Sequence, residues 1–145
     1  MQRDNRLTSD VLGERVGLSA TAVQRRLKRL RATGVIEADV AVIAPRAVGQ
    51  RLQMIVLVSL ERERADIIDR FKASIRTTPN VMNGYYVTGD ADFMLVVSVR
   101  DMEEYESFTR RFFYENPDIK NFKTMVVMDR VKSGFNLVLD TDGAG

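Results

Sequence analysis

Apolar side chains recur at helical spacing between residues 20 and 33, and polar side chains fill the positions between them. At about 100° per residue, Val23, Leu27 and Leu30 fall within one narrow stripe. Lys and Arg side chains gather on the opposite side of the same helical projection. The pattern predicts an amphipathic helix with one packed face and one basic face.

The flanking residues set the ends of this helix. Ser19 can act as the N-cap because its hydroxyl accepts from an amide of the first turn that otherwise lacks a partner. Gly34 favours the left-handed backbone conformation that stops a helix. A shorter helix should precede it, capped by Thr8 or Ser9, and residues 17–19 then form the turn of a helix-turn-helix.

The segment after the basic helix is expected to be extended. Residues 35–36 and 40–43 are rich in β-branched side chains and predict two short strands, which would form the wing of a winged helix-turn-helix. Residues 45–51 are interpreted as a linker. The first domain is therefore expected to span residues 1–44.

From residue 52 the pattern changes to longer strands that alternate with helices. The predicted strands cover residues 52–60, 81–88, 92–99, 119–128 and 135–139, and the predicted helices cover residues 65–76 and 102–115. The order β-α-β-β-α-β is that of an α+β, ferredoxin-like sandwich, in which two helices cover one face of an antiparallel sheet. This domain should span residues 52–140, followed by a frayed tail at residues 141–145.

The other face of that sheet needs cover of its own. Successive strand side chains alternate between faces, so the apolar strand positions cannot all point toward the two helices. These positions include Leu57, Val87, Leu95 and Val97. We therefore expect the open face to meet the same face of a second subunit, which predicts a homodimer.

Composition narrows the chemistry. The chain of 145 residues has no Cys and no His, which excludes disulfides, thiolate chemistry, imidazole bases and most zinc sites. Its longest aliphatic run, residues 54–58, is too short to span a bilayer, and the N-terminus lacks a signal-peptide pattern. We expect a cytoplasmic protein without membrane contact, cofactor or metal ion.

Charge is distributed unevenly along the chain. The net charge is +2, but residues 1–50 carry +4, from nine Lys and Arg against five Asp and Glu, and the remainder carries −2, from 13 against 15. No acidic residue lies between Arg15 and Ile36, so the basic helix lacks the acidic neighbours that a merely solvated helix usually carries. This concentration of positive charge predicts double-stranded DNA as a partner.

The basic helix is interpreted as a DNA-recognition helix. Its small opening residues, Ala20 to Ala22, would allow close approach to base edges and phosphates. Thr21, Arg25 and Lys28 should face the major groove, while Arg29 and Arg31 should mainly touch phosphates. The full set of candidate DNA-binding residues is Ser19, Thr21, Gln24, Arg25, Lys28, Arg29 and Arg31.

With both halves in place, the chain resembles the Lrp/AsnC (feast/famine) family of transcriptional regulators over nearly its full length. The resemblance is carried by residues 12–19, 25–30 and 34–36 in the first domain, and by Val81, Tyr85, residues 87–93, Thr124 and residues 131–132 in the second. It implies a winged helix-turn-helix joined to an amino-acid-sensing domain of the RAM or ACT-like type. It also implies a protein that is at least a homodimer and often an octamer.

One feature departs from the family pattern. Family members usually begin with an additional helix rich in Ile and Leu, whereas this chain starts where that helix would end. The first domain is therefore expected to lack most of its first helix, which leaves part of the apolar stripe without cover. Burying one Val or Leu side chain is typically worth about 1.5–3 kcal/mol. An alternative function is thus an ACT-like small-molecule-binding or assembly module with little or no DNA binding, and an enzyme on this sandwich, such as an acylphosphatase, ranks last.

The turn at residues 88–92 is the candidate effector site. Taken alone, Gly89 and Asp90 suit a tight hairpin turn, but the resemblance implies that an effector, an amino acid, binds near this turn at the interface between dimers. Backbone amides near Gly89 could receive a carboxylate, and Asp90 or Asp92 could pair with an ammonium group. The same two carboxylates are only weak evidence for Mg²⁺. The candidate effector-binding residues are Tyr85, Thr88, Gly89, Asp90, Asp92 and Thr124.

Four aromatic residues in the second predicted helix of this domain form the other conspicuous group. They are Tyr105, Phe108, Phe112 and Phe113. Three of the four share one face of the helix, so we interpret them as core residues and not as a stacking platform for nucleic acid.

Overall fold

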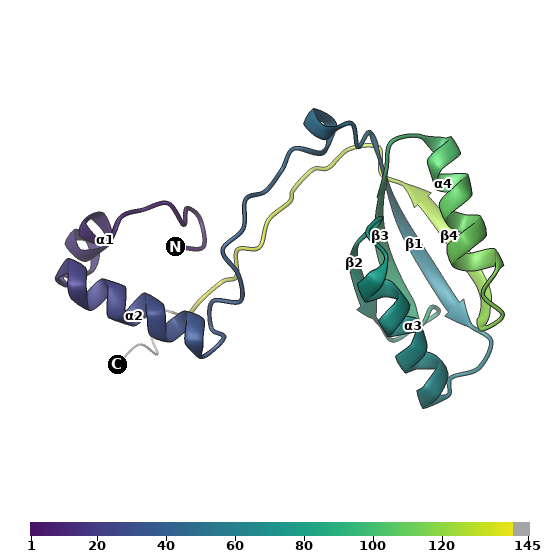
Figure 1. Ribbon diagram of the computed structural model, residues 1–145, viewed down its shortest axis with the longest axis horizontal. Coiled ribbons are helices and arrows are strands. Elements are labelled where there is room, and N and C mark those ends of the chain that lie inside the picture. Colours follow the sequence, from purple (N-terminus) through teal and green to yellow (C-terminus); the bar gives the residue numbers. More distant parts are fainter. Residues whose placement is uncertain (141–145) are drawn as a thin grey trace. The chain divides into compact units, whose positions relative to one another are not determined.

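The computed structural model describes residues 1–140 and divides them into two compact units (Figure 1). The first unit contains residues 1–42 and 131–140, and the second contains residues 43–130. The segment 131–140, predicted to belong with the sheet, thus groups with the N-terminal helices. The predicted tail at residues 141–145 lies outside the described residues.

Two helices form the predicted helix-turn-helix of the first unit. They are α1 (Ser9–Val16) and α2 (Ala20–Ala32). The Thr8 hydroxyl accepts from the amide of Val11, and the Ser19 hydroxyl accepts from the amide of Ala22 at 3.2 Å. Each hydroxyl satisfies an amide that the first helical turn leaves without a partner, so both predicted N-caps are confirmed.

The turn between α1 and α2 packs tightly against Gly13. This residue is buried within α1, and its carbonyl accepts from the amide of Leu18 at 2.9 Å. A Cβ at position 13 would lie only 2.4 Å from the Leu18 carbonyl oxygen. The position therefore requires glycine, because the backbone of the turn occupies the space of a side chain.

Gly34 stops α2 as the sequence predicts. It adopts φ 77°, and its amide donates to the carbonyl of Arg31. The Ile36 amide then donates back to the Leu30 carbonyl at 3.0 Å. The two bonds satisfy carbonyls of the last turn of the helix.

The two predicted wing strands at residues 35–36 and 40–43 are wrong. Within the described chain, no strand is assigned between α2 and residue 52. The Ile36 amide bonds the helix end instead of a neighbouring strand, and Val40 and Val42 remain exposed. Extended residues with neither a ladder partner nor a core to bury into do not form a sheet. The predicted linker contains one 3-10 turn, η1 (Pro45–Val48).

The second unit is built on one antiparallel sheet of four strands. They are β1 (Leu52–Leu60), β2 (Val81–Tyr86), β3 (Phe93–Val99) and β4 (Ile119–Val126), in the spatial order β2-β3-β1-β4. Helix α3 (Ala65–Thr77) follows β1, and α4 (Met102–Thr109) follows β3. Figure 1 shows both helices on one side of the sheet. The ferredoxin-like βαββαβ fold is confirmed.

One sheet face carries the hydrophobic core. Side chains of β1 and β3 alternate between buried and half-buried positions. The buried ones pack against α3 and α4, where Phe71 meets Phe93 edge-on with ring centroids 4.8 Å apart. The buried strand residues are Met54, Val56, Val58, Leu60, Phe93, Leu95, Val97 and Val99. Leu95 and Val97 therefore belong to the helix-covered face.

The opposite sheet face is apolar along its centre, and we call it the open face. Strand pairing places Ile55 beside Val96, and Leu57 beside Met94, on the side away from the buried core residues. Tyr85 lies beside Met94 on β2, so it belongs to this face too. Among the residues that the structure describes, α3 and α4 both lie on the other side.

Three strand predictions differ from the structure. β4 ends at Val126 and not at residue 128. β2 ends at Tyr86 and not at residue 88, because the Val87 amide donates to the Asp92 carbonyl and closes the turn. The predicted fifth strand at residues 135–139 is wrong, and the described chain has no strand after β4. Its side chains are exposed, so neither a core nor a neighbouring ladder stabilises an extended pairing there.

The four aromatic residues around α4 are core residues, as predicted. Tyr105, Phe108 and Phe113 are buried, and Phe112 packs against the same cluster. Helix α4 begins at its predicted cap, where Asp101 accepts from the Glu104 amide. It continues into a π-helical turn, η2 (Arg110–Tyr114), which carries Phe112 and Phe113.

Candidate DNA-binding and effector-binding sites

The candidate DNA-binding side chains lie on the exposed part of α2. Val23 is buried and Leu27 and Leu30 are half-buried, so the predicted packed stripe faces α1 and the rest of the unit. All seven candidates, Ser19, Thr21, Gln24, Arg25, Lys28, Arg29 and Arg31, are exposed. Arg26 is exposed as well, and sequence reasoning left it out because it projects close to the packed stripe.

Arg31 differs from the other candidates because it is held by a carboxylate. Its Nε donates to one oxygen of Asp39 at 2.7 Å, and a terminal nitrogen donates to the other oxygen at 3.2 Å. This hydrogen bonding to Arg31 is the main cause that lowers the pKa of the Asp39 carboxyl below its usual value. The pair joins α2 to the irregular segment that follows it.

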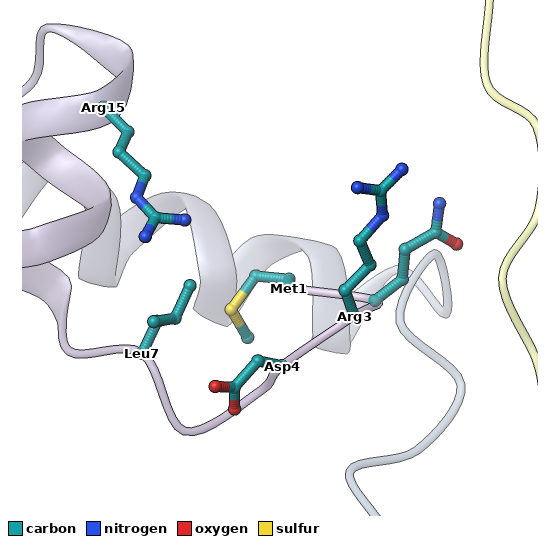
Figure 2. A pocket seen from close by; sticks show the side chains of 6 residues that line it. Met1, Arg3, Asp4, Leu7 and Arg15 are labelled. Carbon is teal, nitrogen blue, oxygen red and sulfur yellow. The ribbon is translucent and has the colours of Figure 1, made fainter.

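A hollow of about 470 Å³ lies beside the N-terminal segment of the first unit (Figure 2). Its lining residues are Met1, Gln2, Arg3, Asp4, Leu7 and Arg15. Figure 2 shows the Arg15 side chain reaching from α1 toward Leu7. Residues 1–8 form no helix, and Val16 of α1 remains 61% exposed.

The turn between β2 and β3 is closed by backbone bonds and by Asp92. The Asp92 amide donates to the Val58 carbonyl, and its carboxylate accepts from the Leu60 amide at 2.7 Å. Leu60 sits where the pairing of β1 with β4 shifts register, so its amide gains a partner from this carboxylate. Asp92 therefore anchors the turn to the end of β1.

A second carboxyl group lies beside Asp92. A hydrogen bond with Asp92, together with repulsion between the two groups, raises the pKa of the Glu63 carboxyl. Within the described residues, no cluster of three or more metal-ligating side chains could hold a metal ion.

A hollow of about 210 Å³ lies on the open face beside this turn. Asp90 and Ala91 line it from the turn, Leu57 and Ser59 from β1, and Lys120, Asn121 and Lys123 from β4. The hollow thus combines one carboxylate, two ammonium groups and an apolar side chain. The two lysines escaped sequence analysis because they lie about 30 residues from the turn along the chain.

The six candidate effector-binding residues do not form one cluster in a single chain. Thr88, Gly89 and Asp90 are exposed at the turn, and Gly89 adopts φ 112°, which glycine accommodates without strain. Tyr85 lies on the open face of β2. Thr124 lies on β4 and pairs with the buried Val56 of β1. Its hydroxyl is hydrogen-bonded to Tyr105 on the helix-covered face. Tyr85 and Thr124 therefore lie on opposite faces of the sheet.

The fold and these sites define a transcriptional regulator with a helix-turn-helix and a separate ligand-binding domain. A family model described as winged helix-turn-helix DNA-binding matches residues 1–37. A second model, described as the Lrp/AsnC ligand binding domain, matches residues 53–137. The chain belongs to the Lrp/AsnC family of transcriptional regulators, and its relatives are regulators and not enzymes.

Named relatives agree with this assignment. An HTH-type transcriptional regulator of Sinorhizobium fredii is 69% identical over 140 residues, which cover 97% of this chain and 83% of that protein. The leucine-responsive regulatory protein of Escherichia coli is 30% identical, over 97% of this chain and 86% of that protein. A transcriptional regulator of Neisseria meningitidis, solved as a complex with L-Met, is 30% identical with a TM-score of 0.88, over 96% of this chain and 90% of that chain.

The described helices contain no segment long and apolar enough to cross a bilayer.

Proposed function

We propose that this regulator responds to a free amino acid bound in the hollow beside the β2–β3 turn. The observation that carries the proposal is the presence of both charge signs in one small hollow, with Asp90, Lys120 and Lys123 all on its lining. A zwitterionic amino acid needs an anionic partner for its ammonium group and cationic partners for its carboxylate. The hollow supplies both.

Each part of an amino acid has a partner in this arrangement. Lys120 and Lys123 would bind the carboxylate, and Asp90 would bind the ammonium group. Leu57 offers an apolar contact for the side chain of the ligand. In this proposal Asp92 does not bind the ammonium group of the ligand, although its sequence position suggests that it would. Its carboxylate already accepts from the Leu60 amide and holds the turn in place.

Two relatives support the class of effector. The Neisseria meningitidis regulator was solved as a complex with L-Met, and the Escherichia coli relative is named as leucine-responsive. Both are 30% identical to this chain, and their names point to two different amino acids. They favour an amino acid for this chain without indicating which one.

Thermal-shift screening of the twenty standard amino acids tests this site. We expect at least one to raise the Tm of the parent protein, and Asp90→Asn to remove most of that shift because the ammonium loses its charged partner. Asp69→Asn, on α3 at the covered side, is the matched control and should respond like the parent. If no amino acid shifts the parent, or if Asp90→Asn responds equally well, the proposed effector site is refuted.

We also propose that the exposed side of α2 reads DNA, with Thr21, Gln24, Arg25 and Lys28 toward the bases and Arg29 on phosphate. Ser19 caps the helix end that would approach the backbone of the duplex. Arg31 is available only when it leaves Asp39. This arrangement follows from which side of α2 is exposed.

Substitution of two arginines separates the two kinds of contact. Arg25→Ala should relax sequence preference by about 1–3 kcal/mol, because a base contact is lost. Arg29→Ala should weaken binding to all sequences alike and reduce the salt slope by about 0.9, which corresponds to one phosphate contact. Anisotropy titrations on selected and random duplexes at several salt concentrations measure both effects. Identical behaviour of the two variants on both duplexes would contradict the assignment.

For assembly, we propose a homodimer formed through the open face, with an octamer as the larger form that the family resemblance implies. The apolar stripe along β1 and β3 supports this, because a face of that kind exposed to water favours association. We also propose a cytoplasmic location, because a transcriptional regulator acts on the chromosome.

A further inference from the structure

One acidic residue of the first unit is paired with a candidate DNA-binding residue. Asp39 follows α2 in the irregular segment, and both of its oxygens accept from the guanidinium of Arg31, at 2.7 and 3.2 Å. Arg31 projects from the last turns of the helix that carries the candidate DNA contacts. A planar guanidinium that binds a carboxylate in this two-pronged manner has the same geometry available for a phosphate.

Asp39 is held by two nitrogens of one guanidinium, and this hydrogen bonding is the main cause that lowers the pKa of its carboxyl. The pair joins the last turns of α2 to the segment that follows the helix, within one unit. The two side chains are 43% and 36% exposed, so a phosphate in solution can reach Arg31.

We propose that Asp39 is an internal competitor for DNA, which keeps Arg31 paired within the protein and so withholds one phosphate contact. The proposal rests on the proposed DNA contacts of α2 and adds a regulatory residue to them. While Arg31 stays paired with Asp39, it makes no phosphate contact and displaces no counterion from the DNA. Arg31 then contributes nothing to the salt dependence of binding while Asp39 is present.

A double-mutant cycle on the full-length chain tests the competition. The parent, Asp39→Asn, Arg31→Ala and the double variant are titrated against a fluorescein-labelled duplex of random sequence, and the salt dependence of binding gives the slope for each. We expect Asp39→Asn to bind severalfold more tightly and to steepen the slope by about 0.9, which is one additional phosphate contact. We expect Arg31→Ala to keep the slope of the parent, and the double variant to show no steepening.

Two further variants isolate the cause. Glu37→Gln removes the same charge two residues away, from a side chain that makes no ion pair within the described residues, so it measures the effect of net charge alone. Arg31→Lys keeps the cation but cannot donate the two-pronged pair, so it should steepen the slope while leaving Asp39 unchanged. It provides a test that does not require any change at Asp39.

The outcomes separate this proposal from the function on which it rests. If Asp39→Asn strengthens binding equally with and without Arg31, or if Arg31→Ala alone flattens the slope, Asp39 is not a competitor. DNA binding by α2 would survive that result. If the parent shows no salt-dependent binding to any duplex, DNA binding itself fails, and the role of Asp39 fails with it.

Discussion

Gly13→Ala is expected to abolish DNA binding and to leave the sheet domain folded. The added methyl group would lie 2.4 Å from the Leu18 carbonyl oxygen, so α1 and the turn must separate. Overpacking of a tight site typically costs about 1–3 kcal/mol. Val23 is the one buried hydrophobic side chain among the described residues of the first unit, so this unit has little packing to offset such a cost.

Two measurements check this prediction. Anisotropy titration should show that Gly13→Ala has lost affinity for every duplex, and circular dichroism should show the unfolding transition of the sheet domain unchanged. Gly134→Ala is the matched control, because a Cβ at that position would meet nothing within 4 Å. A Gly13→Ala protein that binds DNA as the parent does would show that the turn can open without consequence.

Val96→Glu should convert the protein to a monomer. Val96 lies beside Ile55 at the centre of the open face, and a dimer formed through this face would bury the new carboxylate among apolar side chains. Burial of an unpaired charge reduces the free energy of association by several kcal/mol, which is more than the loss of one apolar contact would. Sedimentation velocity at micromolar concentration measures the change.

Met102→Glu is the control for the same added charge. Met102 is exposed at the start of α4, on the other side of the sheet, and an acidic side chain is favourable in the first turn of a helix. This variant should sediment like the parent. If Val96→Glu also sediments like the parent dimer, subunits associate through some other surface.

Local signals predicted the helices well because their causes are local. The hydroxyls of Thr8 and Ser19 and the carboxylate of Asp101 each cap the helix that their position in the sequence indicates. The end of α2 at Gly34 was predictable too, because the left-handed conformation that stops a helix is favoured by a single glycine. The alternation of β1 and β3 could not be assigned to faces from the sequence, because both strands are almost continuously apolar and only the structure separates the buried positions from the half-buried ones.

The errors arose where structure depends on distant partners. Val40 and Val42 have high strand propensity, yet they form no strand because the segment finds no neighbour to pair with. Propensity for strand is a preference for a half-buried pleated surface, and that surface must be supplied by another part of the chain. The fifth predicted strand failed for the same reason.

The candidate effector site was only partly predictable. The turn itself was visible from Gly89 and Asp90, but the lysines that share its hollow come from β4, and only the strand register brings them near. Register also separates Tyr85 from Thr124, because one residue of difference moves a side chain to the other face. The ion pair between Arg31 and Asp39 could not be predicted either, because it depends on the path of the chain after α2.

Residues 131–140 group with the N-terminal helices in the structure, although the ligand-binding family model extends to residue 137. The Gln2 side chain donates to the Leu137 carbonyl at 2.8 Å and accepts from its amide at 3.0 Å, so an amide side chain joins the two ends of the described chain. The chain passes between the units twice, once near residue 42 and again near residue 131. A change in the sheet is thus connected to the helix-turn-helix by two covalent tethers and not one. A deletion beginning at residue 131 would therefore remove part of the unit that contains α1 and α2, although it is made at the opposite end of the chain.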